Sequence, residues 1–170
     1  MTFEPAADAF AQGYDAGAAQ LVWQRLVDDL ETPVSAYLKI AAGQPNAFLF
    51  ESVEGGAWRG RYSIIAMKPD LLWRAWGDRA EIADGAEAIA AARFTAQDGG
   101  ALDSLRDLVA ANRLPLPAGL PPMATGIFGA VGYDMVRLVE NLPHINRDAL
   151  GLPDAIMMRP SIVAIFDSIG

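Results

Sequence analysis

Polar side chains follow an apolar strand directly at one point of the sequence, where a small molecule could bind. The run 48–50 ends in Glu51 and Ser52, and the segment 61–63 (Arg-Tyr-Ser) follows ten residues after Glu51. Glu51 could accept hydrogen bonds from the ammonium group of an amino acid, Ser52 could add a hydroxyl, and apolar neighbours could hold the ligand's side chain. The same pattern is typical of a plain strand end, in which Ser52 caps a turn.

A second segment, residues 126–134, has glycines at every third position, namely Gly126, Gly129 and Gly132. It resembles a phosphate-binding loop only superficially, because the GxGxxG spacing is absent and the chain is acidic. Glycines within a strand more often allow another backbone to approach closely. We therefore interpret this segment as structural.

Other kinds of site have little support in the sequence. It contains one histidine, His144, and no cysteine, which excludes a histidine cluster or a thiolate zinc site. Phosphate-loop, nucleophile-elbow and calcium-loop motifs are absent. We expect no catalytic residue, metal ligand or cofactor site within these 170 residues.

The composition narrows the possible partners. The formal net charge is −8, and such a surface repels nucleic acid and anionic lipid. The first twenty residues lack Lys and Arg, so a secretory signal is not indicated, and no apolar run approaches the roughly 18 residues of a membrane span. We expect a cytoplasmic protein that binds neither nucleic acid nor membrane.

The spacing of apolar residues changes within the first third of the chain. Residues 1–17 show no clear period and are expected to form a flexible lead-in to a single region, 18–170. Apolar residues at three- and four-residue steps from Ala18 to Leu30 predict a helix, which Pro33 should end. Alternation over 34–40 predicts a half-buried strand that could form a hairpin with the strand at 48–50.

The remaining elements complete a fold of the α+β class. We expect mainly antiparallel, sandwich-like sheets with at least two flanking helices, as in a truncated part of a larger enzyme fold. The expected elements are a meander at 62–67, 71–76 and 80–83, a helix at 101–112, a proline-rich connector at 114–122, a buried strand at 124–131, a helix at 133–140, and a strand at 157–167 interrupted near Pro160. The apolar run 162–166 close to residue 170 suggests a piece of a longer protein.

Five segments together resemble the amino-terminal region of the large subunit of anthranilate synthase, in order and spacing. The segments are Thr32-Pro33-Val34, the strand 48–52, the run 61–66, the glycine-containing segment 126–134, and Arg159-Pro160 through Phe166-Asp167. No single segment is specific, but five in register are persuasive. The resemblance covers residues from about 20 onwards.

The resemblance implies a function for the whole enzyme and a lesser role for this part. Enzymes of that family convert chorismate to anthranilate and pyruvate, using Mg²⁺ and ammonia from a glutamine amidotransferase subunit. Their chorismate and Mg²⁺ ligands lie in a carboxy-terminal region. Their amino-terminal region helps to bind tryptophan, the feedback inhibitor, at a strand end that corresponds to residues 49–52. The resemblance therefore implies Glu51, Ser52 and Tyr62 as effector-binding residues.

Several alternatives remain open at this point. Phe50 replaces a commoner leucine and Ser168 a commoner histidine, and neither change removes a polar group from the effector site. The sister enzyme aminodeoxychorismate synthase has a similar amino-terminal region. A free-standing amino-acid-binding module, or an interaction module whose sheet edges dock a catalytic half, would also fit the sequence.

Overall fold

The structure is a computed structural model that describes residues 2–51, 60–143 and 148–168. Its elements, in chain order, are α1 (Ala7–Asp15), α2 (Pro33–Ile40), β1 (Phe48–Glu51), β2 (Tyr62–Trp76), β3 (Arg79–Asp84), α3 (Ala86–Ala90), β4 (Thr95–Ala96), α4 (Ala101–Ala111), η1 (Pro122–Ala124), β5 (Phe128–Val131), η2 (Tyr133–Leu138) and β6 (Ala155–Asp167). Every strand pair is antiparallel. The predicted α+β class with antiparallel pairing is confirmed.

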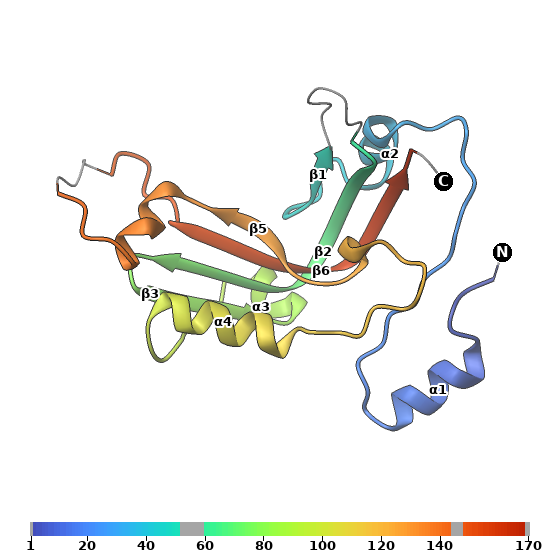
Figure 1. Ribbon diagram of the computed structural model, residues 1–170, viewed down its shortest axis with the longest axis horizontal. Coiled ribbons are helices and arrows are strands. Elements are labelled where there is room, and N and C mark those ends of the chain that lie inside the picture. Colours follow the sequence, from blue (N-terminus) through green and yellow to red (C-terminus); the bar gives the residue numbers. More distant parts are fainter. Residues whose placement is uncertain (1, 52–59, 144–147, 169–170) are drawn as a thin grey trace.

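The described strands form one sheet around the long pair β2 and β6. The order is β4-β3-β2-β6-β5, and β1 pairs with the first half of β2. The sheet bends strongly, so that the half containing β1 turns away from the half containing β3 and β5 (Figure 1). The bend brings together Phe48 of β1 and Phe128 of β5, which belong to unpaired strands, with ring centroids 5.6 Å apart.

Two prolines face each other where β2 and β6 bend. Pro69 lies opposite Pro160, and the register shifts between Pro69 and Leu71. Neither proline has an N–H to donate, so the ladder is weakened here. Lys68 adopts a positive φ of 51°, and the Ser161 hydroxyl donates to the Lys68 carbonyl oxygen over 2.6 Å.

Both strands continue through this irregularity. The expected break at 68–70 and the expected interruption near Pro160 were therefore wrong, because a bulge absorbs the prolines without ending either strand.

Helix α4 covers the half of the sheet built by β2 and β3, and it matches the predicted helix at 101–112. Trp73 of β2 is fully buried against α4 and packs with Leu71, Ala101 and Leu108 in one apolar cluster. The Trp73 indole Nε1 donates a hydrogen bond to the Ser104 hydroxyl over 2.9 Å. A buried indole N–H needs such a partner, so this bond fixes α4 against the strand.

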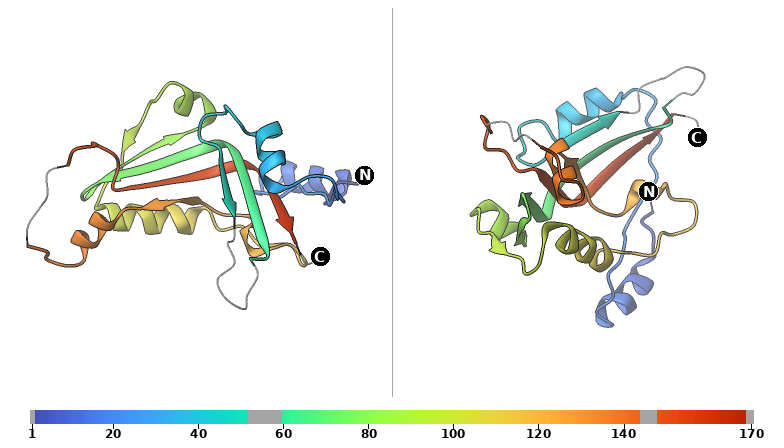
Figure 2. Two further views of the ribbon diagram at one scale, coloured as in Figure 1. Left: turned by 90° about the horizontal axis from the view of Figure 1, so that it is seen from above. Right: turned by 60° about the vertical axis from the view of Figure 1, so that its left-hand side comes forward.

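The predicted helix from Ala18 to Leu30 is wrong, since the structure has no helix over that stretch and places α1 before it. Side chains at Leu26 and Leu30 remain exposed, so a helix there would gain no packed face to stabilise it. The backbone of Trp23 instead exchanges two hydrogen bonds of 2.8 Å with Glu4. Figure 2 shows α1 lying away from the sheet.

The predicted strand at 34–40 is also wrong, because these residues form α2. Thr32 is its N-cap and Pro33 occupies the first turn, where proline is tolerated. The residues expected to face the core include Val34 and Leu38, which are exposed. The expected hairpin with 48–50 does not form either, because β1 pairs with β2.

The glycine-containing segment forms a shorter strand than expected and no α-helix. β5 starts at Phe128 and is mostly exposed, and residues 133–138 form a 3₁₀ helix. A Cβ at Gly129 would lie 1.9 Å from the Ile156 carbonyl oxygen of β6. The close backbone approach expected of these glycines is therefore confirmed at Gly129.

Candidate functional site at the ends of β1 and β2

The structure places two of the three candidate residues at one end of the sheet. Glu51 is the last residue of β1 and is exposed, while Tyr62 is the first residue of β2 and is half-buried. Glu51 lies opposite Ser63 across the strand pair. Ser52, the third candidate, lies outside the described residues.

The strand register puts Glu51 and Tyr62 on opposite faces of the sheet. Residues directly opposite each other share a face, so Glu51 is on the face of Ser63. Neighbouring residues of a strand alternate between faces, so Tyr62 points the other way. The two side chains therefore share an edge of the sheet but no common surface.

Helix α2 covers the face to which Glu51 belongs. Leu49, two residues before Glu51, packs with Ile65 of β2 in an apolar cluster that also contains Ala41 and Tyr37, at the end of α2 and within it. Among the described residues, no side chain or backbone N–H donates a hydrogen bond to the Glu51 carboxylate. An exposed acceptor beside an apolar surface could bind an ammonium group whose side chain is apolar.

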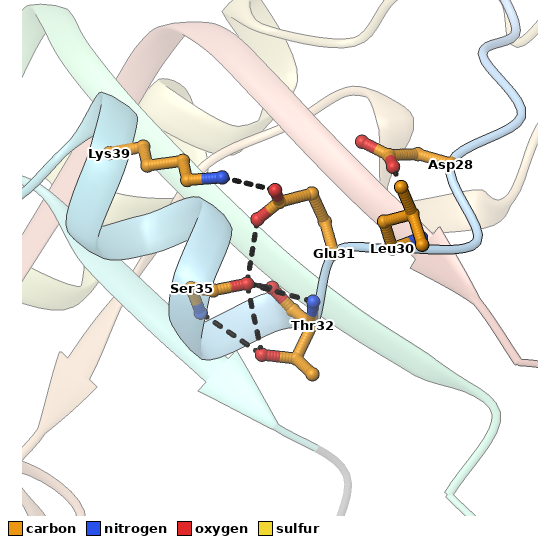
Figure 3. Close-up of polar contacts among 6 residues, drawn as sticks. All are labelled: Asp28, Leu30, Glu31, Thr32, Ser35 and Lys39. Atoms are coloured by element: carbon orange, nitrogen blue, oxygen red, sulfur yellow. Dashed lines mark hydrogen bonds and ion pairs between the residues drawn. The ribbon is translucent and has the colours of Figure 1, made fainter.

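A capping network begins α2 and fixes its position. The Ser35 backbone N–H donates to the Thr32 hydroxyl over 3.1 Å, and the Thr32 backbone N–H donates to the Ser35 hydroxyl over 2.9 Å. Figure 3 shows Glu31 reaching both Ser35 and Lys39. The hydrogen bonds from Lys39 and Ser35 lower the pKa of Glu31 below its ordinary value. This network satisfies donors that a helix start leaves unpaired.

An ion pair between Arg61 and Asp167 lies on the other face of the sheet, at the same end. Arg61 donates from Nε to Asp167 Oδ1 at 2.8 Å and from Nη2 to Oδ2 at 2.7 Å. The hydrogen bond to Asp167 raises the pKa of the Arg61 guanidinium above its ordinary value. The guanidinium also lies 4.9 Å from the centre of the Tyr62 ring. Arg61, the residue immediately before β2, thus contacts the Tyr62 ring as well as Asp167.

The sequence did not predict this ion pair, although the segments 61–66 and 159–167 that supply it are both among those that carry the family resemblance. Opposite charges next to two strand ends were a signal. The pairing could not be read from the sequence, because it depends on β6 lying antiparallel to β2 in a register that sets Tyr62 opposite Asp167.

A hollow of about 340 Å³ lies between α4 and the sheet, lined by Trp73, Ile82, Asp107 and Arg159 among others. Arg159 donates to Asp70 and to Asn112, each over 2.6 Å. Because the Arg159 guanidinium is bound to Asp70 and Asn112, the hollow offers no uncommitted cation for an anionic ligand. These two hydrogen bonds link Asn112, at the end of α4, to Asp70, at the bulge between β2 and β6.

Acidic and histidine side chains are not gathered as metal ligands in the part of the chain that the structure describes. In 2–51, 60–143 and 148–168, no three residues of His, Asp or Glu come together as a metal site would require. Over the same ranges, no helix has the length and apolar character that crossing a bilayer requires.

Sequence comparison finds relatives that are named anthranilate synthase component 1. Residues of this chain are 50% identical over 162 positions to anthranilate synthase component 1 of Cereibacter sphaeroides, covering 95% of this chain and 32% of the relative. The component 1 of Thermus thermophilus is 39% identical over 141 positions, covering 82% of this chain and 28% of the relative. The chain thus spans about a third of the curated relatives it matches. No family model matches the sequence.

Structure comparison agrees with the sequence comparison on the fold. Anthranilate synthase component I from Streptococcus pneumoniae superposes with a TM-score of 0.51 at 24% sequence identity. The match covers 86% of this chain and 29% of that one. The bent antiparallel sheet is therefore a partial region of a larger fold, and the resemblance found in the sequence is confirmed.

Proposed function

We propose that this chain, which matches about a third of an anthranilate synthase component 1, is the part of that enzyme that binds the feedback inhibitor tryptophan. The whole protein would make anthranilate and pyruvate from chorismate, with ammonia derived from glutamine. Residues 1–170 would do no chemistry alone. Their role would be to bind the effector and to support the rest of the enzyme.

The position of Glu51 carries this proposal. Its carboxylate is exposed at the end of β1, accepts no hydrogen bond from a described residue, and lies on the face covered by α2. A carboxylate in that situation suits the ammonium group of tryptophan, because a hydrogen bond between two charged groups is stronger than a neutral one. Apolar neighbours such as Leu49 and Tyr37 supply a surface suited to an indole ring.

The other two candidate residues, Ser52 and Tyr62, would contribute unequally to binding the ligand. Ser52 follows Glu51 and would add a hydroxyl to the amino-acid end of the ligand. Tyr62 lies on the opposite face, so it would reach a ligand bound to Glu51 only around the strand end. We therefore assign the main contacts to Glu51 and Ser52, and a minor one to Tyr62.

The remaining features of the proposal concern the whole enzyme. The relatives are named component 1, which supports a complex with a second component, and the amidotransferase subunit would fill that place. Mg²⁺ and chorismate would be held outside residues 1–170. The protein would work in the cytoplasm as an enzyme of tryptophan biosynthesis. The relatives' names favour this branch over aminodeoxychorismate synthesis.

Tryptophan inhibition of the full-length enzyme tests the proposal at Ser52. Ser52→Phe would fill space meant for the ligand, and Ser52→Ala would remove one hydrogen bond of about 1 kcal/mol, which corresponds to roughly a fivefold loss of affinity. We expect the inhibitory concentration to rise in both variants and more in Ser52→Phe, since a steric clash costs more than a lost bond. Turnover without tryptophan should be nearly normal.

The control is an exposed serine away from the site. Ser161, whose hydroxyl bonds to Lys68 at the bulge, can be changed to Ala in the same enzyme. That variant should keep the normal inhibition curve. An unchanged curve in a folded and active Ser52→Phe enzyme would remove Ser52 from the effector site.

A further inference from the structure

Arg159 of β6 joins three other elements at the bend of the sheet. Its Nε donates to Asp70 Oδ1 of β2 and its Nη1 to Asn112 Oδ1 at the end of α4, each over 2.6 Å. Its Nη2 lies 3.9 Å from Asp84 Oδ1, at the end of β3. A guanidinium holds its donors in one rigid plane, so this single side chain fixes β2, β3 and α4 relative to one another.

Asp70 is the residue that makes the bulge. In the register of β2 with β6, Pro69 and Leu71 lie opposite consecutive residues, so Asp70 between them is the extra one. A bulge bends its strand and increases the local twist. The Asp70 carbonyl oxygen accepts from the Gly85 N–H over 2.7 Å, and its carboxylate is bound by Arg159. The backbone and the side chain of the extra residue are therefore both fixed to the half of the sheet that α4 covers.

The bend places β1 against β5 (Figure 1). Phe48 of β1 and Phe128 of β5 are both half-buried, and their ring centroids lie 5.6 Å apart. Phe128 lies opposite Met158 of β6, the residue next to Arg159. Among the described strands, β1 has only four residues and pairs with β2 alone. The ring contact across the bend is thus a second support for the strand that ends in Glu51.

Stability alone does not account for the contacts of Arg159. Its side chain is 38% exposed, and ion pairs that water can reach contribute little to stability. The guanidinium is not available to a ligand in the hollow beside it either, since Asp70 and Asn112 accept from its Nε and Nη1. Its bonds instead determine the shape of the bulge.

We propose that Arg159 is a positioning residue for the tryptophan site. By holding the bulge to α4 it sets the bend of the sheet, and the bend keeps β1, with Glu51, in place through the contact of Phe48 with Phe128. The inference rests on the proposed function, because it takes Glu51 as a residue of the effector site. Arg159 itself would not touch tryptophan.

Tryptophan inhibition of the full-length enzyme tests this role. Arg159→Ala should raise the inhibitory concentration of tryptophan between about twofold and thirtyfold, the range expected of a residue that acts on a site without touching its ligand. Asn112→Ala, which removes only the link to α4, is a milder second variant and should shift the curve in the same direction. The KM for chorismate should stay nearly normal in both, because chorismate would be bound outside residues 1–170.

A double variant shows whether Arg159 acts through the ring contact. Phe128→Ala removes that contact directly, so combining it with Arg159→Ala should raise the inhibitory concentration no further than the larger single change does. Ser161→Ala is the matched control, since the Ser161 hydroxyl bonds to Lys68 at the same bulge, within the pair of β2 and β6. That variant should leave the inhibition curve unchanged.

Two results would overturn the positioning role. One is a normal inhibition curve in a folded and active Arg159→Ala enzyme. The other is a double variant in which the two single shifts multiply, because Arg159 and Phe128 would then act independently.

Glu51→Gln, measured beside these variants, separates this inference from the proposed function. If Glu51→Gln weakens inhibition while Arg159→Ala does not, only the positioning role is overturned. An unchanged curve for Glu51→Gln would overturn the effector site, and the positioning role with it.

Discussion

Trp73 and Ser104, which are 31 positions apart, form the buried hydrogen bond that ties α4 to the central strand β2. Both side chains are buried, and the indole Nε1 lies 2.9 Å from the Ser104 hydroxyl oxygen. Serine is a modest helix former, so its presence within α4 is explained by this bond and not by helix propensity.

Replacing Ser104 by alanine should destabilise the protein. The change leaves a buried indole N–H unpaired, which costs about 1–3 kcal/mol, and the better helix propensity of alanine recovers only up to roughly 0.5 kcal/mol of that. Denaturant unfolding of wild type and variant measures the difference. Asp103→Ala on the same helix is the matched control, since that side chain is 74% exposed and should change stability little. Equal effects from the two changes would contradict the assigned role of Ser104.

Glu51 and Tyr62 should contribute unequally to tryptophan inhibition. Because their side chains lie on opposite faces of the sheet, a ligand bound at Glu51 should be nearly indifferent to the ring of Tyr62. Glu51→Gln removes a charge-assisted contact worth about 1.5–3 kcal/mol and should raise the inhibitory concentration of tryptophan roughly tenfold or more. Inhibition curves of the full-length variants measure this.

Tyr62→Phe and Tyr62→Ala are the companion variants, and each should shift the inhibition curve by less than Glu51→Gln. A larger shift for Tyr62→Ala would move the effector site to the face that carries Phe50 and Ile64. That outcome would contradict the assignment of Glu51.

The ion pair of Arg61 with Asp167 should be worth little to stability in spite of its two hydrogen bonds. Its side chains are 47% and 28% exposed, and solvent weakens the attraction between charges that water can reach. A double-mutant cycle with Arg61→Ala and Asp167→Ala should give only a small coupling at low salt. The coupling should shrink at about 1 M salt, where charges are screened within about 3 Å. A coupling that is large and independent of salt would show that this pair is a buried one.

Thr32→Ala should weaken α2 and the sheet end that it covers. The change removes the hydroxyl that accepts from the Ser35 N–H, and loss of such an N-cap costs about 1 kcal/mol. Thr32→Ser keeps the accepting oxygen and is the matched control. Thermal unfolding of the two variants measures the difference. A Thr32→Ser variant as unstable as Thr32→Ala would show that the methyl group matters and the cap does not.

Some elements could be predicted because local pattern and tertiary environment agree. The helix at 101–112 was found from its spacing, and its apolar stripe does pack on the sheet through Leu108. The strand at 48–50 was found for a similar reason, as a short apolar run that ends in a polar residue.

Other elements were predicted wrongly because the spacing of apolar residues is present in the sequence, but the rest of the structure does not stabilise the element that the spacing predicts. Residues 18–30 have helical spacing and no surface to pack against, so their apolar side chains stay exposed. Residues 34–40 alternate like a strand, yet the capping box of Thr32 and Ser35 starts a helix there. The capping signal was present in the sequence and outweighs the alternation.

The sequence by itself determined the antiparallel α+β class, the apolar strand that leads to Glu51, the close approach at Gly129 and the resemblance to anthranilate synthase. These features depend on residue type and local spacing, which a sequence records directly. Only the tertiary structure decided that Glu51 and Tyr62 lie on opposite faces, that Arg61 meets Asp167, and that Arg159 binds the extra residue of the bulge. Each of these depends on strand register, and a shift of one residue in register would reverse every face.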